Sequence, residues 1–226
     1  MKLSFLGCGS AFNPELGNTS AYFEYNEDLY LLDCGETTFE RLMKKVDLTK
    51  YQHVFVLITH LHADHVGSLG SLISYYACVL GKKLYVIHPK RTIVELLHLL
   101  GIDDDFYYYE EELPEYLSTV KAEAVSVEHV ENMDAFGYLL KTKTKCIYYS
   151  GDASTVPETI VAQLKNQKID ELYQDTCSWE STHPTHCYIG KLEQLIEPKL
   201  RYKVYCMHLD EGCRVVAQNK GFSVVN

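Results

Sequence analysis

The chemically richest stretch of the chain is His60-Leu61-His62-Ala63-Asp64-His65. It follows the short, β-branched apolar run 54–58, which is typical of a strand buried on both faces. Apolar residues then recur at helical spacing to about Leu80, so we expect the cluster on a loop between a strand's carboxyl end and a helix. Open α/β folds place their chemistry there. Three imidazoles and a carboxylate at this density suit zinc better than a polar turn with scattered histidines.

Three more candidate ligands each stand at the end of a predicted strand. They are His129 after strand 117–128, Asp152 after strand 146–149 and His208 after strand 203–207. A lone histidine at such a position is more often structural. Together with the first cluster, however, these groups suffice for two metals that share a carboxylate and a water. Gly151 allows the backbone to approach the site closely.

The rest of the chain predicts alternating strands and helices. We expect further strands over 2–6, 20–25, 29–33, 84–87, 137–141 and 172–173, helices over 37–46, 91–100, 157–166 and 189–196, and one or two short strands after Arg214. Segment 103–116 is rich in acidic residues and tyrosine; a solvated connection is the preferred interpretation and a rim or interface element the alternative. With no repeat or linker, residues 1–226 are expected to form one α/β domain with two sheets and outer helices.

Composition narrows the function classes. The chain has 226 residues, 46% hydrophobic and 23% charged, and a formal net charge of −10. These proportions are ordinary for a globular protein, and the negative charge makes a general polyanion binder a poor fit. The opening apolar run is too short for a signal peptide, no stretch reaches the length of a membrane span, and the eight cysteines form no C-x-x-C pair. We therefore expect a cytoplasmic protein with reduced thiols.

The order of the candidate ligands resembles the ligand order of the metallo-β-lactamase fold. It consists of an H-x-H-x-D-H motif, a later histidine, a Gly-Asp pair and a final histidine. This implies a four-layer αββα sandwich with two mixed β-sheets and helices on the outer faces. The segments Phe5–Ala11, Leu32–Glu36 and Tyr149–Asp152 also resemble the RNase Z-like phosphodiesterase branch. The resemblance implies two zinc ions, with manganese as an alternative. It puts His60, His62 and His129 on one ion, Asp64, His65 and His208 on the other, and Asp152 between them.

A second pair resembles that branch's catalytic helper. Gln174-Asp175-Thr176 stands where the family has His-Glu-Ala, and His186 stands where it has His-Ser-Thr. His186 is thus expected to protonate the leaving oxygen while Asp175 holds its tautomer. The match is looser, because Asp replaces Glu and Cys187 replaces Ser. His183 is the competing candidate. The remaining histidines outside the site are expected to be structural: His53, His88 and His98.

The implied chemistry is phosphodiester hydrolysis by a metal-bridging hydroxide. Asp64 is expected to orient that hydroxide or take its proton, so it joins His186 and Asp175 as a catalytic candidate. Asp33, in the Asp-Cys-Gly turn, is expected to fix the ring of a ligand histidine.

The length of the segment between the His129 and Asp152 positions indicates the size of the substrate. The tRNA-processing members insert a long arm between the His129 and Asp152 positions, whereas only residues 130–151 lie there in this chain. With the −10 charge, this makes tRNA an improbable partner. Arm-less relatives include enzymes that open cyclic nucleotides, so a small nucleotide-like phosphodiester is the expected substrate and a homodimer the expected assembly. The alternatives are an RNase Z-type tRNA 3′ endonuclease, a glyoxalase- or lactamase-like thioester or lactam hydrolase, and a non-catalytic metal-binding module.

Overall fold

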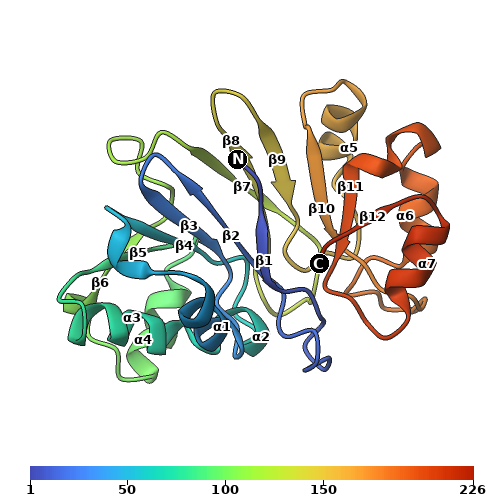
Figure 1. The fold of residues 1–226 in the computed structure, drawn as a ribbon. Helices are drawn as coiled ribbons and strands as arrows, with labels where there is room; N and C mark the ends of the chain where they lie inside the picture. Colours follow the sequence, from blue (N-terminus) through green and yellow to red (C-terminus); the bar gives the residue numbers. More distant parts are fainter.

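Twelve strands form two mixed sheets that face each other in the computed structural model, which describes residues 1–226 (Figure 1). The first sheet runs in chain order through β1 (Ser4–Gly7), β2 (Ser20–Tyr25), β3 (Asp28–Leu32), β4 (Val54–Leu57), β5 (Leu84–Ile87) and β6 (Tyr107–Glu110). The second contains β7 (Lys121–Ser126), β8 (Phe136–Lys141), β9 (Cys146–Tyr149), β10 (Glu171–Asp175), β11 (Val204–Met207) and β12 (Ser223–Val224). Each begins with antiparallel pairs and continues with parallel strands.

Helices cover the outer face of each sheet (Figure 1). The first sheet is covered by α1 (Thr38–Lys45), α2 (Ala63–Val66), α3 (Leu69–Cys78) and α4 (Thr92–Leu99), and the second by α5 (Glu158–Lys165), α6 (Ile189–Leu195) and α7 (Cys213–Asn219). Three short 3₁₀ helices complete the structure: η1 (Leu48–Lys50), η2 (Asp104–Phe106) and η3 (Pro198–Lys203). The predicted αββα sandwich is confirmed. None of the helices combines the length and the apolar character that a membrane crossing requires.

Alternation along the strands builds the core between the sheets. Leu29 and Leu31 of β3 face the helices, whereas Tyr30 and Leu32 face the second sheet. Tyr30 stacks between Phe23 and Phe55, with ring centroids 4.7 and 5.1 Å apart. Because both faces of β3 and β4 are buried, these strands read as continuous apolar runs. This rigid double layer holds the strand ends that carry the candidate ligands.

Two segments differ from the sequence prediction. Within 103–116, Asp103–Asp105 are exposed as predicted, but Tyr107–Glu110 forms edge strand β6, parallel to β5, so the segment is more than a solvated connection. Pairing with β5 satisfies the backbone of a segment whose composition suggested exposure. The tail also differs, because Cys213–Asn219 is helix α7 and only Ser223–Val224 is a strand. Cys213 and Ala217, one turn apart, are buried, and this tertiary burial selects the helix.

The helix predicted after His65 is divided into α2 and α3. Gly67 and Ser68 separate them, and Glu36 packs so closely against Gly67 that an added Cβ would lie 2.5 Å from Glu36 Cγ. The Ser68 hydroxyl also donates to the carbonyl of Gly35. Packing of the 34–36 turn into this break orients α2, which carries Asp64 and His65.

Candidate metal centre

The seven predicted ligands converge from both sheets. The loop after β4 carries His60 and His62, and the first turn of α2 carries Asp64 and His65. The other three follow strands of the second sheet: His129 after β7, Asp152 after β9 and His208 after β11. Five of the seven residues are buried and His62 is half-buried; the His129 side chain is only 1% exposed. Parallel strands end at a common edge, which explains why residues distant in sequence meet here.

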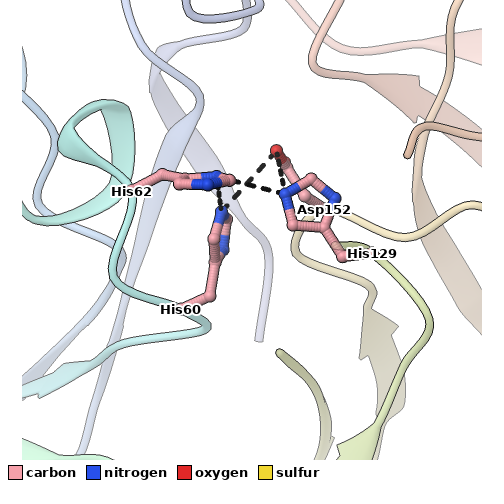
Figure 2. Close-up of side chains that lie close together, drawn as sticks. All are labelled: His60, His62, His129 and Asp152. Carbon is pink, nitrogen blue, oxygen red and sulfur yellow. Dashed lines mark hydrogen bonds and ion pairs between the residues drawn. The ribbon is translucent and has the colours of Figure 1, made fainter. Parts of the chain in front are cut away.

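One group consists of three histidines and Asp152, whose side chains point toward one another in Figure 2. Nδ1 of His62 lies 3.0 Å from Nε2 of His60 and 3.1 Å from Nε2 of His129. Oδ2 of Asp152 lies 3.8 Å from the same nitrogens of His60 and His129. His62 thus presents Nδ1 to the centre, whereas the other two present Nε2.

The second group shares Asp152 with the first. Oδ1 of Asp152 lies 3.2 Å from Nε2 of His65 and 3.5 Å from Nε2 of His208. Oδ2 of Asp64 lies 3.3 Å from each of these two nitrogens. The two oxygens of Asp152 therefore face different groups of ligands, the arrangement that a carboxylate between two cations requires.

The donor set fits divalent cations. In each group the candidate ligand atoms lie within 4.8 Å of one another. His65 Nε2 and Asp152 Oδ1 are buried and make no hydrogen bond, which is costly for polar atoms unless another partner satisfies them. Imidazole nitrogens and carboxylate oxygens are ligands of zinc and of manganese. The residues present therefore suit two such ions.

Outer hydrogen bonds set the tautomers of the ligand histidines. Nδ1 of His65 donates to Oδ2 of Asp33 at 2.9 Å, the type of contact predicted for Asp33. Nδ1 of His129 donates to the backbone carbonyl of Thr185 at 2.7 Å. Nδ1 of His208 faces Oδ1 of Asp175 at 3.4 Å, an ion-pair distance rather than a hydrogen bond. Each contact leaves the Nε2 lone pair directed into the site.

The predicted helper pair lies beside the second group. His186 Nδ1 donates to Asp175 Oδ2 at 2.8 Å, and the backbone N–H of Ala153 donates to the same oxygen at 3.0 Å. His186 Nδ1 is also 3.7 Å from Asp152 Oδ2. His183, the competing candidate, is exposed in the same loop, and its backbone N–H bonds Ser181. The structure thus brings His186, and not His183, to the candidate site.

Burial and the neighbouring carboxylates shift the pKa values of the ligand histidines in opposite directions. Burial lowers the pKa of His60 well below its usual value, which favours the neutral imidazole that ligation needs. Burial also opposes protonation of His208, but Asp152, Asp175 and Asp64 raise its pKa to about 10. The carboxylates similarly overcome burial at His65 and raise its pKa. The centre therefore attracts positive charge strongly.

Strained backbone accompanies these contacts. Asp33 and His208 adopt left-handed φ angles of 61° and 57°, conformations uncommon outside glycine. Gly151 has φ 59°, and a Cβ there would lie 2.7 Å from Cβ of Thr59. The predicted close approach of the backbone at Gly151 is therefore present, and it places the following Asp152 in the centre.

The other histidines bond outside the site. His53 Nδ1 lies 2.9 Å from Asp28 Oδ1, and exposed His98 lies 2.7 Å from Asp104. His88 Nδ1 lies 2.7 Å from the carbonyl of Lys90.

Two residues that support the site were not predicted from the sequence. Thr59 lies against Asp33 and His60; a hydroxyl directly before the first ligand was the available clue. Asp210 accepts hydrogen bonds from the backbone N–H and hydroxyl of Ser178 at 2.8 and 3.0 Å. It ties the loop that carries His186 to the strand end that carries His208.

Comparisons with known proteins agree with this geometry. An "Anti-Pycsar protein Apyc1" of Bacillus phage 010DV004 is 31% identical, over 94% of this chain and 90% of its own. A "Ribonuclease Z" of Methanococcus maripaludis is 34% identical over 104 residues, 45% of this chain, and the match spans only a third of that enzyme's length (33%). The metallo-β-lactamase fold protein YhfI of Bacillus subtilis superposes with a TM-score of 0.79 at 15% identity, over 99% and 94% of the two chains.

These likenesses confirm the predicted metallo-β-lactamase fold, its RNase Z-like branch and the class of metal-dependent hydrolases. Residues 1–225 match the family described as Anti-Pycsar protein Apyc1. Because that match spans almost the whole sequence, the chain belongs to the Anti-Pycsar protein Apyc1 family.

Proposed function

We propose that this protein is a phosphodiesterase that uses two divalent cations, preferably zinc, to hydrolyse a small cyclic nucleotide. The observation that carries the proposal is the position of Asp152, whose two oxygens face separate groups of ligands. In this proposal His60, His62 and His129 would hold one cation, Asp64, His65 and His208 would hold the other, and Asp152 would contribute an oxygen to each. When bound, such a pair supplies a water with a pKa of about 7 and neutralises charge on the phosphoryl oxygens.

The side chains around the pair divide the remaining work. Burial raises the pKa of Asp64, but the nearby His208 and His65 side chains lower it below its usual value overall, so Asp64 is an ionised acceptor. It can orient the attacking water or receive its proton. His186 keeps its Nδ1 proton on Asp175, which leaves Nε2 to donate a proton to the leaving oxygen. Burial lowers the pKa of His186, but Asp175 and Asp152 raise it overall above its usual value, which favours the protonated donor.

The size of the substrate is argued from the segment between two ligands. Between His129 and Asp152 the chain forms only a short loop and the β8–β9 hairpin. Nothing in this segment extends away to grip a large nucleic acid. The resemblance to arm-less relatives that open cyclic nucleotides also favours a small nucleotide over tRNA. A homodimer is the assembly we propose, by likeness to arm-less relatives.

A substrate screen of the metal-loaded protein tests the proposal. It compares 3′,5′- and 2′,3′-cyclic mononucleotides, cyclic dinucleotides, bis-p-nitrophenyl phosphate, a thioester and a precursor tRNA. We expect turnover of a cyclic mononucleotide that Asp64→Ala abolishes. Faster cleavage of the precursor tRNA would favour the RNase Z alternative, and turnover of the thioester alone would favour the glyoxalase-like one. Metal-loaded protein that is inert toward every substrate would favour a non-catalytic module.

A further inference from the structure

The hydroxyl of Thr59 lies between Asp33 and His60 in the wall of the candidate metal centre. All three residues are fully buried, with no exposed surface. Oγ1 of Thr59 is 3.0 Å from each carboxylate oxygen of Asp33 and 3.0 Å from Nδ1 of His60. A longer contact of 3.5 Å reaches Nδ1 of His65, whose nearer partner is Asp33 at 2.9 Å.

Counting protons gives these contacts a direction. An ionised Asp33 only accepts: Oδ1 accepts from the backbone N–H of Thr59 at 2.8 Å, and Oδ2 accepts from His65. The Thr59 hydroxyl has one proton, which it donates to Asp33. It can then only accept from His60, which must carry its proton on Nδ1. That tautomer leaves the lone pair of His60 Nε2 facing His62 and Asp152.

We propose that Thr59 is a positioning residue that extends the reach of Asp33 from one cation position to the other. Asp33 orients His65 directly and orients His60 through the Thr59 hydroxyl. One buried carboxylate thereby sets the tautomer of a ligand in each group. This inference rests on the proposed function, because it presupposes that both groups bind cations.

The surrounding structure locks this relay in place. A Cβ built on Gly151 would lie 2.7 and 2.8 Å from Cβ and Cγ2 of Thr59, so the backbone of Gly151 packs against the threonine. This contact holds the methyl group on one side and the hydroxyl toward Asp33. Asp33 in turn keeps a left-handed φ of 61°, which its hydrogen bonds to Thr59 and His65 stabilise.

Metal titration of variants tests the relay, with zinc competed against a chromophoric chelator. Thr59→Val replaces the hydroxyl by a methyl group of similar size and should weaken one of the two cation positions about 10–100-fold, as for other outer partners of metal ligands. Asparagine tolerates a left-handed φ, so Asp33→Asn should keep the backbone conformation. This variant should weaken zinc binding at both cation positions. Thr59→Ser should keep wild-type affinity. The matched control is Thr38→Val, because the Thr38 hydroxyl is equally buried but has no hydrogen-bond partner.

Imidazole NMR of the zinc-loaded wild-type protein gives a readout independent of activity and of variant folding. We expect the His60 proton on Nδ1, protected from exchange. A proton on Nε2, wild-type zinc affinity in Thr59→Val, or an effect of Asp33→Asn on only one position would overturn the relay. Failure of the proposed function looks different: the wild-type protein would then bind no zinc, or bind it without hydrolysing any phosphodiester.

Discussion

Asp175 accepts the Nδ1 proton of His186 on one carboxylate oxygen, at 2.8 Å, and presents the other oxygen to Nδ1 of His208 at 3.4 Å. A single buried carboxylate therefore contacts both the proposed proton donor and a proposed metal ligand. The loop after β10 and the strand end after β11 are held in one arrangement by this residue. A substitution of His186 therefore alters the proposed proton donor, a substitution of His208 alters the metal centre, and a substitution of Asp175 affects both.

Replacing His186 with alanine should lower kcat for cyclic nucleotide hydrolysis by about 10²–10⁴-fold, the usual contribution of general acid catalysis. Zinc content should stay at the wild-type level, because His186 is not among the proposed ligands. His183→Ala removes an exposed imidazole from the same loop and serves as the matched control. Equal losses in the two variants would contradict a specific role for His186.

The pH profile of kcat should report the charge on Asp175. Burial lowers the pKa of His186, but Asp175 and Asp152 shift it upward overall, so His186 stays protonated to higher pH than a free imidazole. Since the protonated form donates, kcat should fall as pH rises through this raised pKa. Asp175→Asn removes one of the charges and should move that alkaline limb to lower pH. A limb that stays in place in Asp175→Asn but disappears in His186→Ala would show that Asp175 does not tune the donor.

Asp152→Asn should lose both cations, since each proposed position uses a different oxygen of this carboxylate. Elemental analysis after reconstitution measures the stoichiometry. Asp105→Asn is the control, because the Asp105 side chain is 95% exposed. Zinc at 100 times its Kd should also stabilise the wild-type protein by about 2.7 kcal/mol per site, read as a higher Tm, and the variant should lose this increment. Retention of one full equivalent of zinc by Asp152→Asn would rule out the shared carboxylate.

Gly151→Ala should destabilise the fold more than Gly81→Ala. Both glycines have left-handed φ, 59° and 63°, where a Cβ costs about 1–2 kcal/mol. Only at Gly151 would the Cβ also meet Thr59, at 2.7 Å, whereas nothing lies within 4 Å at Gly81. We expect a further loss of about 1–3 kcal/mol from overpacking at Gly151, measured by denaturant unfolding. Equal losses at the two positions would mean that the contact with Thr59 relaxes freely.

Local sequence was sufficient to predict most of the architecture. Buried strands such as Val54–Leu57 and Cys146–Tyr149 read as short apolar runs, and polar residues directly after them marked the strand ends. Local sequence patterns did not predict edge strand Tyr107–Glu110 or helix Cys213–Asn219. Their conformations depend on β5 and on burial of one helix face, which are contacts with distant parts of the chain.

The sequence by itself determined which side chains are available for metal chemistry and their order along the chain. Only the tertiary structure decided that His62 turns Nδ1 inward, that Asp152 divides its oxygens between two groups, and that Thr59 stands between Asp33 and His60. The physical reason is that ring orientation and tautomer are set by hydrogen bonds from remote segments, such as the Thr185 carbonyl on His129. The sequence therefore shows the types of the ligands and their order, whereas tertiary packing sets the direction in which each lone pair points.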